Sequence, residues 1–536
     1  MGGCAAAYGI ALVVNFHEVI ASVYVDSDAA VGPVLAQAIG HAPAGSYVSL
    51  GNHAWYEEWL FLLATRGAPG HRQLWQIAPA LVSLAGLALF VVAAWRVWGG
   101  RYALLSGAAL LCVGAFGRFC FLSFGWHSFA FTHMIILVAA SLWFLDHAER
   151  ISLRGLVIVS VCLGAACALP TASDGLFPFW ALGPLIARSA AAAWHAPSRL
   201  RARLAAFVVI VLVASVVGAV AIAGAMRAGG VTARALPITL ATPGRIGHNI
   251  ELLAESYAYL AGGRLTAPRL DAQGILVPAT ALLVLLALSA GLVRLARVSL
   301  GRVAPPARLS TPQVFYVAFW ASSLIATSLV FIGTTAPRNA LSGRYLLGAY
   351  AAIAALLPLI ALQGERARRA VMIGVCALAL VTTYQLIRRP FEVIHPPDEA
   401  LRFPGLTTAA ALASFAREQR VSYGYGGYWD AEALTWETGF KVLIRPVRVC
   451  SASASFALCY PQIGMISSWY APKPHTRSLL IVDEVGVSFN GVLGRDRALG
   501  RPRAMRRLDG ITAYVYPYDI ASRLALPHCH FSWAHP

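Results

Sequence analysis

The stretch AAAYGIALVVNFHEVIASVYVDSDAA, residues 5–30, holds the two features that decide the fold. Its apolar part is about as long as an α-helix must be to cross the hydrocarbon of a bilayer, which takes roughly 20 residues. Asp26 and Asp28 follow directly, where such a helix would leave the membrane. His17 and Glu18 interrupt the apolar run and no convincing cleavage site follows it, so we interpret it as a membrane helix rather than a signal peptide.

The composition of the whole chain agrees with a membrane protein. Of 536 residues, 58% are hydrophobic and 12% are charged, and the mean hydropathy is +0.65. Water-soluble domains carry a larger share of charge. The net charge of +18 comes almost wholly from arginine, because Lys441 and Lys473 are the only lysines. The arginines cluster in short loops between apolar runs and form no stripe interleaved with aromatic residues, so nucleic acid is not an expected partner.

Apolar runs of suitable length recur along the chain and predict a polytopic α-helical membrane protein with about eleven transmembrane helices. With the N-terminus in the cytoplasm, the arginine-rich loops fall on the cytoplasmic side, as the positive-inside rule requires. The odd number of spans then places the C-terminal region outside. The expected spans lie near 5–24, 77–98, 102–123, 127–146, 152–169, 175–194, 204–225, 274–294, 312–333, 345–363 and 370–387.

Two domains are expected. Residues 1–388 form the transmembrane domain, with long outer loops near 25–76 and 226–273, and long outer loops usually carry function. Residues 389–536 contain strand-like segments, SLLIVDEVG and ITAYVYPYD, and a helix-like segment, TTAAALASFAREQ. They predict a small extracytoplasmic α/β or α+β domain.

Two cysteines of this C-terminal region, Cys450 and Cys459, bound the segment CSASASFALC. They could close a disulfide in an oxidising compartment, and two reduced thiols are the alternative. No CxxC or Cys/His spacing suggests zinc.

The paired acids of the opening stretch are candidates for chemistry. A carboxylate beside lipid is costly unless it is solvated, paired or used, and burial would raise its pKa toward a value suited to proton abstraction. The alternative is that Asp26 and Asp28 are solvated acids at the end of a helix. An Asp-x-Asp triplet also occurs in metal-dependent sugar transferases, but three residues recur by chance, and we predict no metal and no cofactor here.

Other polar residues gather near the expected outer ends of the helices, where ionisable groups are functional candidates by default. Arginine suits phosphate through its planar fork of donors, so Arg338 and Arg344 are the preferred ligands of a lipid phosphate. Each member could instead be structural, as an ion pair of Arg118 with Asp174 or as an interfacial anchor. The full set is Arg118, His127, His133, Asp174, Arg338, Arg344 and Tyr345.

This architecture resembles the GT-C class of integral-membrane glycosyltransferases. The resemblance rests on the first helix with its DSD motif, the long first outer loop, the further spans and the C-terminal domain. The segments DSDAAVGPVLAQA and GNHAWYEEWLFLLATRGAPGHRQLW are similar to loops in large, mostly actinobacterial membrane proteins of this type. Class members more often carry two adjacent acids than Asp-Ser-Asp.

The resemblance implies an enzyme of the bacterial plasma membrane that moves a sugar from a polyprenyl-phosphate donor to a glycan, glycolipid or protein outside the cytoplasm. It implies that Asp28, or alternatively Asp26, is the general base. The donor phosphate would contact Arg344, Arg338, Tyr345 and Arg118. The acceptor or sugar would contact His53, Glu57, Glu58, His127 and Asp174.

Other interpretations remain open. The aromatic residues Tyr425, Tyr428, Trp429 and Trp436 could stack on sugars, although aromatics more often build a core. A membrane transporter or lipid flippase would show inverted repeats and broken helices with polar sites at mid-membrane. Here the polar residues lie near the expected outer boundary, and no repeat is evident. A non-catalytic membrane scaffold would tolerate replacement of both early aspartates.

Overall fold

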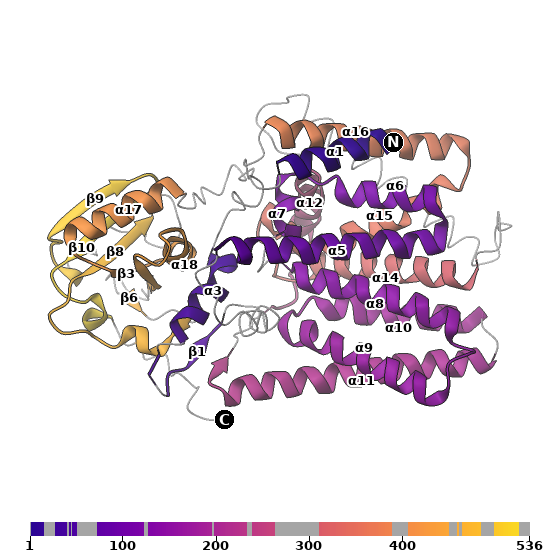
Figure 1. Cartoon of the computed structure of the whole chain (residues 1–536), viewed down its shortest axis with the longest axis horizontal. Helices are drawn as coiled ribbons and strands as arrows, with labels where there is room; N and C mark the ends of the chain where they lie inside the picture. Colours follow the sequence, from indigo (N-terminus) through magenta and orange to yellow (C-terminus); the bar gives the residue numbers. More distant parts are fainter. Residues whose placement is uncertain are drawn as a thin grey trace. The chain divides into compact units, whose positions relative to one another are not determined.

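The structure is a computed structural model of the chain. The residues that it describes are 2–15, 27–39, 42–43, 45–50, 72–122, 127–195, 198–232, 238–262, 310–388, 406–449, 458–459, 464–483 and 498–524. The chain forms two compact units, each assembled from three separate stretches (Figure 1). The first unit contains residues 1–23, 73–222 and 237–396, and the second contains residues 24–72, 223–236 and 397–536.

The first unit is a bundle of helices. Seven described helices are long and apolar enough to cross a membrane, and they confirm the expected polytopic helical class. The helices of this unit are α1 (Gly2–Val14), α5 (Arg72–Trp98), α6 (Gly100–Leu111), α7 (Ala115–Leu122), α8 (Ser128–His147), α9 (Leu153–Ser173), the π-helix η1 (Pro178–Leu182), α10 (Gly183–His195), α11 (Ser198–Ala228), α12 (Pro243–Leu260), α14 (Thr311–Gly333), the 3-10 helix η2 (Ala340–Leu346), α15 (Leu347–Ala361) and α16 (Glu365–Arg388).

The expected count of eleven spans is not established. The expected span 102–123 is instead two shorter helices, α6 and α7, separated at residues 112–114. Gly114 lies at this break and packs directly against Gly262. Glycine is needed there, because a Cβ atom on residue 114 would lie 2.2 Å from the Cα of Gly262. The expected span 175–194 contains the π-helix η1 followed by α10, and the expected span 274–294 lies outside the described residues.

Helix α15 forms the centre of this bundle. Nearly all of its residues are buried, and it packs against α6, α14 and α16. Its sequence, LGAYAAIAALLPLIA, is rich in alanine, which allows helices to approach closely in a membrane, where packing rather than water exclusion drives association. At Gly348 the Trp180 ring takes the place of a side chain, since a Cβ atom would lie 2.9 Å from Trp180 Cγ.

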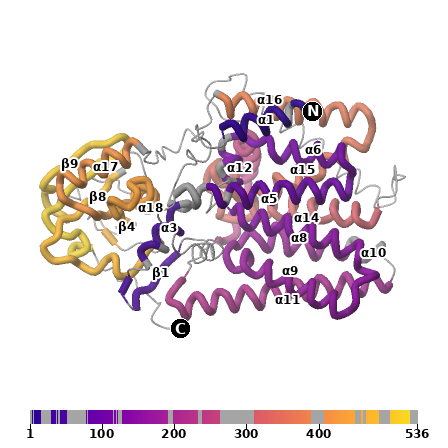
Figure 2. Tube along the Cα trace, viewed as in Figure 1, coloured from indigo at the N-terminus to yellow at the C-terminus, as the bar shows by residue number. Residues whose placement is uncertain are grey.

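Helices α9 and α11 lie side by side (Figure 2), and small residues join them as well. A Cβ atom on Gly164 would lie 2.5 Å from the Ala214 methyl, and one on Gly218 would lie 2.6 Å from the Ala168 methyl. Ser215 adds a hydrogen bond of 3.2 Å to the Gly164 carbonyl. The backbones of α9 and α11 therefore lie close together.

The second unit is built on a five-stranded mixed sheet in the order β4-β3-β8-β10-β9. Strand β3 runs parallel to β4 and β8, whereas β10 is antiparallel to β8 and β9. Its elements are α3 (Ser27–Ile39), β1 (Val48–Ser49), β2 (Val231–Thr232), α17 (Leu406–Gln419), β3 (Tyr423–Gly426), α18 (Tyr428–Glu437), β4 (Leu443–Pro446), β5 (Arg448–Val449), β6 (Leu458–Cys459), β7 (Met465–Ile466), the 3-10 helix η3 (Ser467–Tyr470), β8 (Ser478–Asp483), β9 (Ala504–Leu508), β10 (Ile511–Tyr516) and the 3-10 helix η4 (Ile520–Arg523).

The two faces of this sheet differ in chemistry. One face packs aliphatic residues such as Leu479 and Ile481 against α17 and α18. The other face carries a tyrosine-rich cluster that includes Tyr425 and Tyr516. Side chains alternate between the two faces of a strand, so each strand contributes to both layers.

A second, three-stranded sheet, in the order β2-β1-β7, joins distant parts of the chain. Val48 pairs with Val231 on one side and with Ile466 on the other. The expected outer loops near 25–76 and 226–273 thus both contribute a strand beside the C-terminal region. The expected division at residue 388 had assigned both loops to the transmembrane domain.

Candidate functional site

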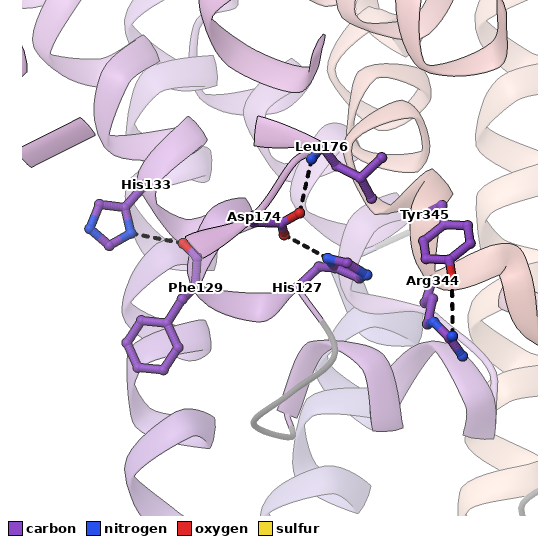
Figure 3. Close-up of polar contacts among 7 residues, drawn as sticks. All are labelled: His127, Phe129, His133, Asp174, Leu176, Arg344 and Tyr345. Atoms are coloured by element: carbon purple, nitrogen blue, oxygen red, sulfur yellow. Dashed lines mark hydrogen bonds and ion pairs between the residues drawn. The ribbon is translucent and has the colours of Figure 1, made fainter. Parts of the chain in front are cut away.

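A buried histidine–carboxylate pair lies between the start of α8 and the end of α9 (Figure 3). His127 precedes α8 in a left-handed conformation (φ 69°), and Asp174 follows α9. Oδ2 of Asp174 lies 2.6 Å from Nδ1 of His127, and both side chains are almost completely buried. An ionised carboxylate only accepts hydrogen bonds, so His127 donates its Nδ1–H to Asp174.

The surrounding backbone fixes this pair. The Leu176 amide donates to Oδ1 of Asp174 at 2.9 Å, and the Phe131 amide donates to the His127 carbonyl at 3.0 Å. The carboxylate therefore has a partner on each oxygen, as a buried charge requires.

The imidazole of His127 also touches two aromatic rings. Its centroid lies 5.8 Å from the Trp180 ring of η1 and 5.5 Å from the Tyr345 ring of η2, both in edge contacts. The pair of His127 and Asp174 thus connects α8 and α9 with the segment that carries Arg344.

Arg344 and Tyr345 lie side by side on η2 and are both only half-buried. Nη2 of Arg344 donates to the Tyr345 hydroxyl at 3.1 Å, and the guanidinium carbon lies 5.0 Å from the Tyr345 ring centroid. Tyr345 therefore contacts the buried pair with its ring and the arginine with its hydroxyl (Figure 3). The guanidinium of Arg344 is therefore held at a partly accessible position, next to a tyrosine that contacts the buried pair of His127 and Asp174.

Local sequence explains the shape of η2. Asn339 caps the helix by accepting a hydrogen bond of 3.1 Å from the Leu341 amide, and Ser342 Oγ accepts one of 3.0 Å from the Arg338 amide. Gly343 lets η2 approach α12, because a Cβ atom there would lie 3.2 Å from the Ser256 carbonyl.

Helix α12 holds the chain that leads into η2. The buried Asn249 amide donates to the carbonyls of Ile332 and Thr334, each at 2.9 Å. Arg245 donates to the Pro337 carbonyl at 2.8 Å. Sequence reasoning missed these two residues, although Asn249 stands among apolar residues in the stretch NIELL.

Arg338, Arg118 and His133 have different surroundings. Arg338 is exposed. Arg118 is buried on α7, where Nη1 donates to the Val113 carbonyl at 3.3 Å, and the Tyr8 hydroxyl donates to the same carbonyl, also at 3.3 Å. His133 donates to the Phe129 carbonyl of its own helix at 2.9 Å. Arg118 thus satisfies a carbonyl that the break between α6 and α7 leaves without a helical partner.

The candidate residues of the expected first outer loop are only partly described. Asp28 lies in the first turn of α3, and its side chain is not described. Asp26, His53, Glu57 and Glu58 lie outside the described residues.

Cys459 is disulfide-bonded. It stands on β6 opposite Arg448 of β5, a strand that ends directly before Cys450. Cys450 itself lies outside the described residues, so its pairing with Cys459 stays a prediction.

The aromatic residues of the C-terminal region are mainly part of the core. Tyr425 and Trp436 are buried, whereas Tyr428 and Trp429 are half-buried. Tyr425 donates to Oδ1 of Asp519 at 2.7 Å, and burial raises the pKa of its hydroxyl. Tyr425 and Trp436 are therefore not placed to stack on a sugar.

Within the described part of the chain, no three His, Cys, Asp or Glu side chains gather in a way that could hold a metal ion.

No protein-family model and no curated protein matches the sequence. Among solved structures, ArnT from Cupriavidus metallidurans bound to undecaprenyl phosphate matches with a TM-score of 0.50 and 12% identity, covering 96% of this chain and 98% of that chain. The apo state of ArnT matches with a TM-score of 0.42 and 14% identity over the same shares. The first match shows an ArnT-like fold over nearly the whole chain.

Proposed function

We propose that the protein is a membrane glycosyltransferase that moves a sugar from a polyprenyl-phosphate donor to an acceptor outside the cytoplasm. The observation that carries the proposal is the Arg344–Tyr345 site, a half-buried guanidinium held against a tyrosine that rests on a buried His–Asp pair. The ArnT structure with the same fold holds undecaprenyl phosphate, which supports a lipid phosphate as the ligand of this site.

The proposed reaction is a nucleophilic substitution at the anomeric carbon of the donor. Asp28, or alternatively Asp26, takes the proton of an acceptor hydroxyl, and the hydroxyl oxygen bonds to the anomeric carbon. The bond from this carbon to the phosphate oxygen breaks, and polyprenyl phosphate leaves with the bonding electrons. The resulting negative charge requires cationic donors, since charge that develops in a transition state is stabilised by preorganised groups.

Arg344 is the proposed ligand of the donor phosphate, with Tyr345 as its neighbour. The exposed Arg338 is a second, looser contact. Arg118 was expected to bind phosphate as well, but its burial and its hydrogen bond to the Val113 carbonyl favour a structural role.

His127 and Asp174 were expected to contact the acceptor or its sugar. Their burial behind Tyr345 favours a different role, in which they hold that ring in place. His53, Glu57 and Glu58 remain the candidates for the acceptor, which is a glycan, a glycolipid or a protein.

The proposed location is the bacterial plasma membrane, with the N-terminus in the cytoplasm and the C-terminal region outside. The lipid-linked sugar is the substrate and carries the leaving group, and no cofactor is part of the proposed reaction.

A lipid flippase is the second candidate. The break between α6 and α7 makes a discontinuous helix, a feature that transporters use to build binding sites in the membrane. Transport leaves the bond between sugar and phosphate intact, which separates the two candidates.

The test is to incubate the purified protein with polyprenyl-phosphate donors carrying mannose, arabinose, glucose or galactose and with a bacterial envelope extract. Mass spectrometry then measures the release of free polyprenyl phosphate. We expect release with one donor of the panel. Movement of an intact donor across sealed vesicles without release would instead establish the flippase.

A further inference from the structure

Helix α3, which carries the proposed base Asp28, is part of the interior of the second unit. Ala30, Val31, Val34 and Leu35 are almost completely buried. Helix α3 packs against α18, a helix about 400 residues later in the chain (Figure 1), and it also touches β7.

Helix α18 is buried on both sides. Ala431 and Leu434 belong to the cluster that covers the five-stranded sheet. Ala433 is also completely buried and points about 200° away from Ala431, because successive residues of an α-helix are rotated by about 100°. Ala433 therefore lies on a different side of α18 from Ala431, and that side is buried as well.

A second connection runs through Gly464, the residue before β7. Gly464 adopts a left-handed conformation (φ 64°), which favours glycine. A Cβ atom there would lie 2.7 Å from Oε1 of Glu432 and 2.7 Å from the Tyr428 ring, so two side chains of α18 rest directly on this backbone. Beyond Gly464, β7 pairs with β1 of the first outer loop.

We propose that α18 and the segment 464–466 set the position of the first-loop helix α3, so that Ala433 and Gly464 are positioning residues for Asp28. The inference rests on the proposed function and extends it. It gives the C-terminal region the role of holding the first loop, because that loop is held at two separate points, α3 on α18 and β1 on β7.

Two pairs of variants test this inference. Gly464→Ala and Gly500→Ala both place alanine at a left-handed position, with φ 64° and 71°, but only at Gly464 does the added methyl meet other atoms. Ala433→Val and Ala431→Val both enlarge a buried alanine of α18, the first on the side that we assign to α3 and the second on the side that packs on the sheet. Gly500→Ala controls for the backbone strain of alanine at a left-handed position, and Ala431→Val controls for overpacking of α18 on its sheet side.

We expect kcat to fall about tenfold or more in Gly464→Ala and Ala433→Val, with the donor KM within about twofold of wild type, since small misplacement of a catalytic group is costly. The controls should keep wild-type kcat. Unchanged kcat in both test variants, or equal losses in the controls, would overturn the inference.

A measurement without turnover separates this inference from the proposed function. Hydrogen exchange of the α3 amides should be faster in Gly464→Ala and Ala433→Val than in wild type and in both controls. If this pattern holds while the wild-type protein releases no polyprenyl phosphate, the proposed function fails and the positioning of α3 stands. If α3 exchange is the same in all five proteins, the positioning role is wrong.

Discussion

Oδ2 of Asp174 lies 2.6 Å from Nδ1 of His127, and the centroid of the same imidazole ring lies 5.5 Å from the centroid of the Tyr345 ring. The carboxylate thus determines which imidazole nitrogen carries the proton, and the imidazole in turn bears on the tyrosine that accepts a hydrogen bond from Arg344. A buried network of this kind acts as a unit, because leaving one member without its partner costs more than the average hydrogen bond contributes.

Asp174→Asn tests this network. The amide keeps the shape of the carboxylate but loses its charge, so the His127 ring is less firmly held and Tyr345 moves. We expect the donor KM to rise about tenfold, as for the loss of one buried hydrogen bond to a charged group. The control is His133→Asn, which changes a histidine that bonds only to the Phe129 carbonyl among its described contacts. Equal donor KM values in wild type and Asp174→Asn would contradict the role of the pair.

The identity of the cation at residue 344 should matter as well as its charge. Arg344→Lys keeps a positive charge and loses the planar fork, whereas Arg344→Ala loses both. We expect donor affinity to fall about fivefold in the first and about thirtyfold in the second, and less in Arg338→Ala, since charge-assisted hydrogen bonds are the strong ones. Equilibrium binding of polyprenyl phosphate measures this order. A greater loss in Arg338→Ala than in Arg344→Ala would reverse the assignment.

Asn249 should be required for the placement of η2. Asn249→Leu leaves the carbonyls of Ile332 and Thr334 without their donor, and we expect a loss of stability of about 2 kcal/mol. Thermal unfolding in detergent measures the loss. His248→Ala is the control, because that neighbouring side chain is 57% exposed. If the two variants unfold at the same temperature, Asn249 does not hold this segment.

The break between α6 and α7 should depend on glycine. Gly114→Ala would place a methyl group 2.2 Å from Gly262, and we expect a loss of about 1–3 kcal/mol from overpacking. Gly9→Ala is the matched control on α1, where no atom lies within 4 Å of an added Cβ. Unchanged thermal unfolding of Gly114→Ala would show that the close approach is not essential.

The sequence predicts those features that depend on runs of neighbouring residues. The expected span 127–146 corresponds to α8, because an unbroken apolar segment of this length has few alternatives to a membrane helix. The expected span 102–123 is equally apolar, yet it breaks at Gly114. At this break Gly114 packs against Gly262, far along the chain, and hydropathy cannot report such a contact.

In the candidate site, too, residue types predict some features, whereas others depend on contacts between distant parts of the chain. Arginine and tyrosine at residues 344 and 345 could be identified as candidates from their types and their place near a helix end. The role of His127 depends on its left-handed backbone and on its contact with Tyr345, which residue types do not encode. Likewise, the two-residue strands β1 and β7 have no periodicity that a sequence pattern could reveal, although they connect the segment expected to form the first outer loop with the C-terminal region.

The proposed base allows the most direct test of the proposed function. Turnover of the donor identified in the panel should be compared between wild type, Asp28→Asn and Glu251→Gln, whose side chain on α12 is 83% exposed. We predict that Asp28→Asn lowers kcat by about a hundredfold or more, the usual contribution of a general base, while it binds polyprenyl phosphate as wild type does. Wild-type turnover in both Asp28→Asn and Asp26→Asn would contradict the account.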